Sequence, residues 1–164
     1  MGIRNSSRGL RFGLTVAGAV AGLVAAGAAP AGAAPTGAVP AGAVPAQKVA
    51  LTRTNHSCDG VRIDGDRPTP FGQAVVTRPA SGKLVVSVSV TGASPDTTYA
   101  IRVIQLLPGD ADCHGIAGYL TTDSLGGGRA SVQELVLPGA SQAWVDLNAT
   151  DDFTNFLDSD PVSF

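Results

Sequence analysis

The sequence lacks any cluster of basic residues after its first eleven positions. From residue 47 onward it has eight Lys and Arg against thirteen Asp and Glu, a net charge of −5. Proteins that bind nucleic acid or anionic lipid need concentrated Lys and Arg for phosphate contacts. We therefore expect no nucleic-acid partner, and no membrane contact once the N-terminal segment described below is removed.

Catalytic signatures are absent as well. The motifs G-x-S-x-G, S-x-x-K and H-E-x-x-H do not occur, and among the aspartates no spacing singles out an acid–base pair. A Ser-His-Asp triad would have to use His56 or His114, which lie beside the two cysteines. The sequence thus predicts a protein that is not an enzyme and that carries no cofactor.

Cysteine, methionine and large aromatic residues are scarce. The only cysteines are Cys58 and Cys113, and the only methionine is Met1. A blue-copper centre would need a Met near its Cys and His, and the adjacent pair Cys113-His114 suits a zinc site poorly. In an exported protein the two thiols instead predict one disulfide, which would stabilise the fold by about 4 kcal/mol on the chain-entropy model.

The N-terminal segment has the three parts of a secretory signal. Three arginines lie within the first eleven residues, and residues 12–29 carry no charge. Small-residue sites lie at the end of this stretch, at Ala26-Gly27-Ala28, and just after it, at Ala31-Gly32-Ala33. The arginines are never adjacent, which argues against a twin-arginine signal. We assign residues 1–33 to a cleaved signal peptide and expect a secreted or cell-envelope protein.

Residues 34–46 are rich in Ala, Pro and Gly and contain the repeat GAVPAGAVPA. Proline at every fifth position prevents a helix, so this stretch is predicted to be an extended linker. The remaining residues, 47–164, are enough for one domain with a single core.

Alternating apolar and polar residues predict strands in that domain. The clearest is 83–91, in which Leu84, Val86, Val88 and Val90 share one face. The expected strands are 48–52, 72–77, 83–91, 99–107, 118–122, 129–137, 142–148 and 161–164. About seven or eight strands separated by Gly, Pro and Asp turns predict an all-β, Ig-like antiparallel β-sandwich.

Two finer expectations concern pairing. Strands 83–91 and 99–107 are predicted to form a hairpin with each other, because Gly92 to Asp96 is rich in turn residues. Within 129–137 the apolar phase changes between Val132 and Leu135, which predicts a β-bulge.

Closely spaced aspartates raise the question of calcium. The candidate ligands are Asp64, Asp66, Asp110 and Asp112, whose loops the disulfide would bring together. None matches the EF-hand pattern, and solvated turns, which Asp favours, are the alternative.

Trp144 is the only tryptophan, and strand alternation places it on the same face as Asp146. Since the opposite face is aliphatic, Trp144 is expected to point to solvent. An outward ring beside a carboxylate predicts a ligand-binding platform for a small molecule. The alternative is that the ring covers a sheet edge or packs under the loop at residues 151–155.

Three stretches carry a resemblance: 81–105, 121–128 (TTDSLGGG) and the ending PVSF at 161–164. The chain resembles the small secreted Ig-like domains of high-GC actinobacteria and, more remotely, the neocarzinostatin-type apoproteins. That resemblance implies a sandwich of seven strands that shelters a small molecule, although those apoproteins have two disulfides. The functions expected are therefore a binding or envelope-associated module, a small-molecule carrier, or a calcium-dependent adhesion module, with the partner unknown.

Overall fold

The computed structural model describes residues 44–63, 69–111, 113 and 115–164. These residues contain ten strands and no helix, so none of them forms a helix that could cross a membrane. The predicted signal peptide and most of the predicted linker lie outside the described residues. The strands are β1 (Val44–Thr52), β2 (Gly72–Arg78), β3 (Lys83–Val90), β4 (Thr98–Leu107), β5 (Asp110–Ala111), β6 (Gly118–Thr121), β7 (Gly128–Leu135), β8 (Gln142–Ala149), β9 (Phe156–Ser159) and β10 (Val162–Ser163).

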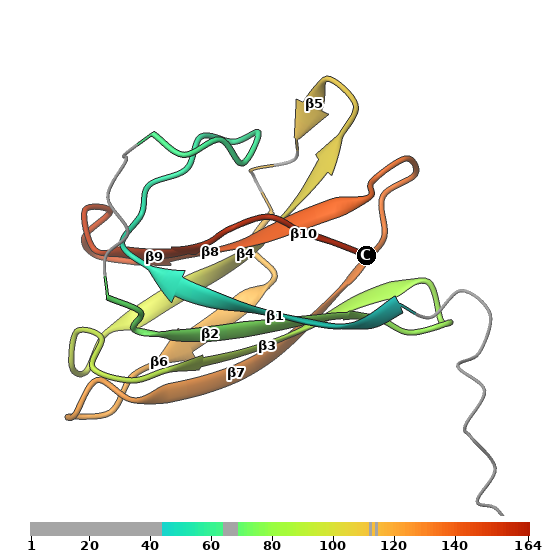
Figure 1. The fold of residues 1–164 in the computed structure, drawn as a ribbon. Coiled ribbons are helices and arrows are strands. Elements are labelled where there is room, and N and C mark those ends of the chain that lie inside the picture. Colours follow the sequence, from blue (N-terminus) through green and yellow to red (C-terminus); the bar gives the residue numbers. More distant parts are fainter. Residues whose placement is uncertain (1–43, 64–68, 112, 114) are drawn as a thin grey trace, which may run out of the picture. The chain divides into compact units, whose positions relative to one another are not determined.

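All strand pairs are antiparallel and belong to one curled sheet (Figure 1). One half of the sheet has the order β1-β2-β3-β7. The other half is built around β4 and β8, with β5 and β6 on the free edge of β4 and with β9 and β10 beside β8. The two halves are joined where β1 pairs with β9 at Leu51 and Thr52.

The core lies inside the curl. Leu84, Val86, Val88 and Val90 of β3 are buried, as their alternation predicts, and they belong to one apolar cluster with Ile101, Val103, Val145 and Leu147 of β4 and β8. Between β4 and β7, which do not pair, the Gln105 side chain supplies polar contacts. Its Nε2 donates to Leu135 O, and its Oε1 accepts from Leu137 N, each at 2.9 Å.

The all-β class and the absence of helix among the described residues confirm the coarse prediction. The predicted hairpin between 83–91 and 99–107 is wrong, because β3 pairs with β2 and β7, whereas β4 pairs with β5, β6 and β8. The turn after β3 carries the chain into the other half of the sheet. Alternation fixes which face of a strand is buried but not which strand lies beside it.

Three further features of the strands differ from expectation. No bulge interrupts β7, whose register with β3 is regular throughout, and Leu135 is simply exposed at its end. β1 begins at Val44, inside the predicted linker, with a register shift before Gln47. The short strands β5 and β9 were not expected, because two and four residues are too few for alternation to be recognised.

Candidate functional site

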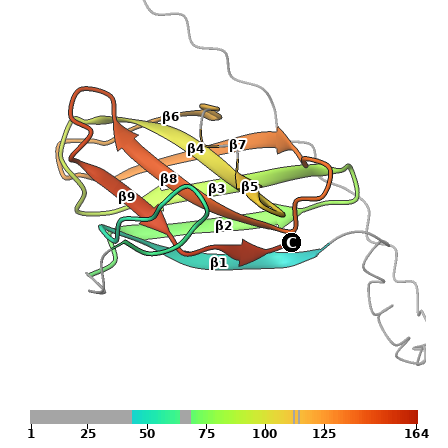
Figure 2. The same ribbon diagram turned by 90° about the horizontal axis from the view of Figure 1, so that it is seen from above.

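Residues 53–63, here named the cover loop, leave the end of β1 and lie over the outer face of β8 and β9 (Figure 2). The loop is held by its own backbone: Ser57 N donates to Val61 O, and Gly60 N donates to Ser57 O, both at 2.8 Å. His56 and Arg62 form an antiparallel bridge at its base. The loop is therefore an ordered structure that covers part of the sheet.

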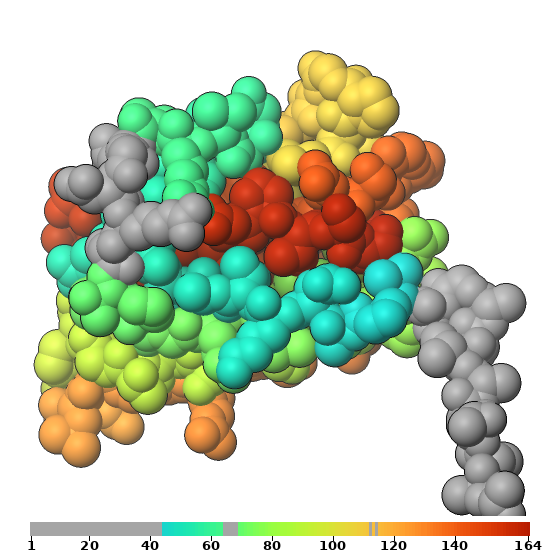
Figure 3. Space-filling view, viewed as in Figure 1, coloured from blue at the N-terminus to red at the C-terminus, as the bar shows by residue number. Residues whose placement is uncertain are grey.

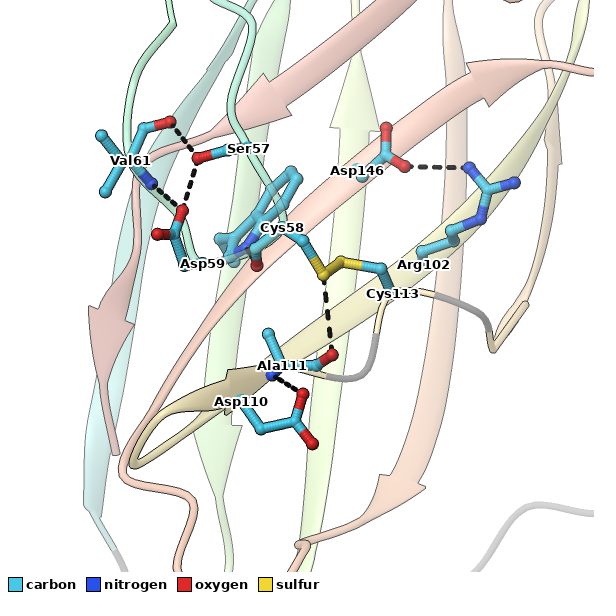
Figure 4. Close-up of a disulfide and its surroundings, with 10 residues drawn as sticks. Ser57, Cys58, Asp59, Val61, Arg102, Asp110, Ala111, Cys113 and Asp146 are labelled. Atoms are coloured by element: carbon cyan, nitrogen blue, oxygen red, sulfur yellow. Dashed lines mark hydrogen bonds and ion pairs between the residues drawn. A yellow bond between two sulfur atoms is a disulfide. The ribbon is translucent and has the colours of Figure 1, made fainter.

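A disulfide between Cys58 and Cys113 fixes the loop to the segment after β5 (Figure 4). The two Cα atoms lie 5.9 Å apart and are separated by 55 residues in sequence, a distance typical of disulfides. This confirms the predicted disulfide and removes both thiols as metal ligands. Figure 3 shows the loop and the β4–β5 hairpin rising side by side above the C-terminal strands.

Trp144 lies beneath the cover loop. Its Nε1 donates to Cys58 O at 3.4 Å, and its ring centroid lies 5.5 Å from that of His56. Strand alternation gave the correct face, since Ala143 and Val145 point into the core. However, the expectation that Trp144 and Asp146 face solvent is wrong: they are only 3% and 7% exposed. A loop from a distant part of the sequence covers them, which periodicity within the strand cannot reveal.

Two carboxyl groups meet below the loop. Asp146 on β8 and Asp158 on β9 are direct cross-strand partners. Asp146 accepts hydrogen bonds from Arg102 Nη1, at 3.0 Å, and from the Asn148 side chain. Asp158 accepts one from His56 N at 3.2 Å, whereas its Oδ1 receives no donor from the described residues.

The environment of Asp158 changes its chemistry. Burial, and then the neighbouring negative charge of Asp146, raise the pKa of Asp158 to about 8. A carboxyl with that pKa is mostly protonated at neutral pH, and in that form it can share its proton with an adjacent carboxylate. The pair is therefore a site where one proton, or another cation, is needed.

A second acidic group flanks the histidine. Asp160 forms an ion pair with Arg62, and this hydrogen bond is the main cause that lowers the pKa of Asp160. His56 Nε2 lies 3.3 Å from Asp160 Oδ1, and His56 Nδ1 lies 3.1 Å from Thr54 O. Both ring nitrogens thus face oxygen acceptors, and the imidazole anchors the loop to β9.

Several hollows border the cover loop, and two of them are distinguished by their lining. The first, the disulfide groove, has a volume of about 590 Å³ and lies between the loop and the β4–β5 hairpin. It is lined by Ser57, Cys58, Asp59, Leu106, Leu107, Gly109, Asp110 and Ala111. The second, the acidic pocket, has a volume of about 170 Å³ and is lined by Asn55, His56, Trp144, Asp146, Asn148, Phe153, Phe156 and Asp158.

The structure brings the predicted small-molecule ligand residues together but not the predicted calcium ligands that it describes. Trp144 and Asp146 come together in the wall of the acidic pocket. Of the predicted calcium ligands, Asp64, Asp66 and Asp112 lie outside the described residues. Asp110 is on the exposed β4–β5 hairpin, where its Oδ1 accepts from Ala111 N at 2.7 Å. Within the described ranges, no group of three or more His, Cys, Asp or Glu is arranged to hold a metal ion.

Sequence reasoning missed Asp158 as a site residue. The alternation in Phe156–Ser159 carries a signal, since Leu157 points into the core and its neighbour Asp158 must then point to the outer face. What it could not show is that Asp146 lies opposite. No known protein family, curated protein or solved structure matches the chain.

Proposed function

We propose that this chain is an exported binding module with an Ig-like β-sandwich fold, and that the disulfide groove binds a small organic molecule. The observation that carries the proposal is the groove itself. Its volume of about 590 Å³ lies within the range of sites for small-molecule ligands. Such a role agrees with the resemblance to the neocarzinostatin-type apoproteins, which shelter a small molecule.

The lining of the groove has the mixed character that such sites need. Leu106 and Leu107 supply apolar surface from the end of β4, and both are only half-buried. Asp59 and Asp110 add a carboxylate on each side. Hydrogen bonds from Ser57 and from Val61 N hold Asp59 in place and lower its pKa, so it is ionised at neutral pH. An apolar ligand that carries a hydrogen-bond donor would fit this surface.

Binding is favoured over catalysis by the state of the reactive groups. The His56 side chain is 1% exposed and is engaged on both ring nitrogens, so a substrate could not reach it. A general base must come within hydrogen-bond distance of the proton that it removes. His56, the histidine among the described residues, is thus withheld from that role.

Fluorescence of the single tryptophan tests the proposal, because Trp144 Nε1 donates to the carbonyl of Cys58, a groove residue. The purified exported protein is titrated with a panel of apolar metabolites. We expect saturable quenching or a spectral shift, which Leu107→Ser weakens at least several-fold. Leu125→Ser is the matched control, since Leu125 is 84% exposed and does not line the groove.

Two results would contradict the proposal. One is an absence of any spectral change across the panel, with Leu107→Ser indistinguishable from the Leu125→Ser control. The other is turnover of glycosidic, ester or peptide substrates that survives repurification and that one Asp or His substitution abolishes. The latter would make the protein an enzyme.

Export to the culture medium or envelope is part of the same proposal. The basic start, apolar stretch and small-residue sites support a cleaved signal over residues 1–33, followed by a spacer that holds the domain away from an envelope. Intact mass of protein recovered from the medium should correspond to a chain that starts at Ala34. Retention of residues 1–33 in that protein would contradict cleavage.

A further inference from the structure

The acidic pocket is separate from the disulfide groove. Leu106, in the groove, pairs with Gln142 at the start of β8, whereas Asn148, in the pocket, lies near the end of that strand. Binding in the acidic pocket is therefore independent of the function proposed for the groove.

One charge in and around this pocket is left without a permanent counter-ion. Arg102 pairs with Asp146, and Arg62 pairs with Asp160. Asp158 faces Asp146 from β8 and His56 from the cover loop, whose Nδ1 is 3.5 Å from Oδ2. Asp158 is only 3% exposed, and no Arg or Lys among the described residues forms an ion pair with it.

The Oδ1 atom of Asp158 distinguishes this pocket from an ordinary group of acidic residues. Its Oδ1 is buried and receives no donor within the described part of the chain, and the residue lines the pocket. A buried acceptor without a donor costs about 1–3 kcal/mol. A proton on the carboxyl pair removes that cost, and so would an N–H group from a ligand.

Three of the other residues that line the pocket are aromatic, and they lie beside the amides of Asn55 and Asn148. Trp144, Phe153 and Phe156 line the pocket, and Phe153 is 72% exposed. Aromatic faces attract a cation that lies within about 6 Å, whereas metal ions need several oxygen or nitrogen ligands at fixed geometry. No described cluster meets the latter requirement. A volume of about 170 Å³ admits a group equal to about five or six water molecules.

We propose that the acidic pocket binds the primary ammonium group of a small apolar amine, whose N–H donates to Asp158 Oδ1 while its alkyl part contacts Phe153 and Phe156. The ammonium replaces the proton that the two facing carboxyl groups otherwise share. Binding therefore releases that proton to solvent and becomes tighter as pH rises.

Titration with n-butylammonium, followed by calorimetry and by chemical-shift changes, tests this site. Because burial and Asp146 raise the pKa of Asp158 to about 8, only a small fraction of Asp158 is ionised at pH 6.5. The apparent dissociation constant scales inversely with that fraction. We expect affinity to increase by about tenfold or more between pH 6.5 and pH 8.5, with proton release detected as a buffer-dependent enthalpy.

Three comparisons make the test specific. Asp158→Asn should abolish both binding and its pH dependence, while Asp96→Asn, at an exposed turn position that lines neither the groove nor the pocket, should bind as the wild type does. Phe153→Ala, at a position that is 72% exposed, should weaken binding by about twofold to fivefold. The neutral 1-butanol and the quaternary tetramethylammonium, which has no N–H, should both bind at least tenfold more weakly.

The proposal is overturned if n-butylammonium does not bind at either pH. It is equally overturned if 1-butanol or tetramethylammonium binds as tightly, or if affinity is independent of pH. Unchanged binding by both Asp158→Asn and Phe153→Ala would place the amine elsewhere on the protein. These outcomes leave the proposal for the groove standing, because that titration is judged by Leu107→Ser, and Leu107 lines the groove but not the acidic pocket.

Discussion

The strands β3 and β8 have the same length but are buried in different ways. β3 packs one face on the core and leaves Ser87 of the other face in solvent. β8 is buried on both faces: Val145 and Leu147 point to the core, while Trp144 and Asp146 lie under the cover loop. The difference shows that the outer face of β8 is a second, smaller interior. The buried histidine and aspartates of the described residues, His56, Asp146 and Asp158, lie there.

The largest expected effect on stability is that of the disulfide that holds the cover loop over the outer face. Replacing both cysteines, in Cys58→Ser/Cys113→Ser, releases a loop of 55 residues and should lower the free energy of unfolding by about 4 kcal/mol. Chemical denaturation of the oxidised and double-mutant proteins measures this difference. An equal stability of the two proteins would mean that the disulfide does not constrain the unfolded chain.

A matched pair on β4 compares the two faces directly. Ile101 points to the core and is 0% exposed, while Ile104 points to the outer face and is 2% exposed. Because both are buried, each change to alanine should cost about 2–5 kcal/mol. If Ile104→Ala costs less than about 1 kcal/mol while Ile101→Ala costs the full amount, the outer face is not a packed interior.

The carboxyl pair gives the outer face a pH dependence of its own. The folded protein holds a proton on Asp158 up to about pH 8, whereas the unfolded chain loses it near the ordinary pKa of 3.8. The folded state thus binds more protons between these values, and this contribution to stability falls as pH rises, by up to about 1.4 kcal/mol per pH unit. It is fully present below about pH 4 and is gone above about pH 8.

Asp158→Asn isolates that contribution, since an amide cannot titrate. Between pH 5 and pH 8 the stability of the variant should rise relative to that of the wild type, as measured by denaturation at each pH. The Asp96→Asn control, at an exposed turn position, should follow the wild type. A constant difference between Asp158→Asn and wild type across this range would show that Asp158 is ionised in the folded protein.

Two glycines sharpen the comparison at the smallest scale. Gly60 and Gly82 both have positive φ, 77° and 76°, so alanine strains the backbone equally at each, by about 1 kcal/mol. A Cβ at Gly60 would lie 2.7 Å from Pro161 Cγ, whereas one at Gly82 would meet nothing within 4 Å. Thermal melts should therefore show a greater loss for Gly60→Ala. Equal losses would mean that the cover loop is not closely packed against Pro161.

The same contrast decides how much could be predicted from sequence. In β3, alternation gave the bounds and the buried face, because a strand with one solvated face shows its period directly. The partner strands were wrong, since pairing depends on the whole topology. In β8 the face of Trp144 was right but its exposure was wrong. The residues of the cover loop lie nearly ninety positions before Trp144 in the sequence. Only the predicted disulfide indicated that they lie near this face of β8.

Quenching of Trp144 fluorescence by acrylamide tests the central claim, that the cover loop closes over the outer face of β8, most directly. Trp144 is the only tryptophan and is 3% exposed. In the oxidised native protein we predict a blue-shifted emission that acrylamide barely quenches, and strong quenching after reduction of the Cys58–Cys113 disulfide, with the far-ultraviolet circular dichroism of the sheet retained. Efficient quenching of the oxidised protein would contradict the claim and restore Trp144 as an exposed platform.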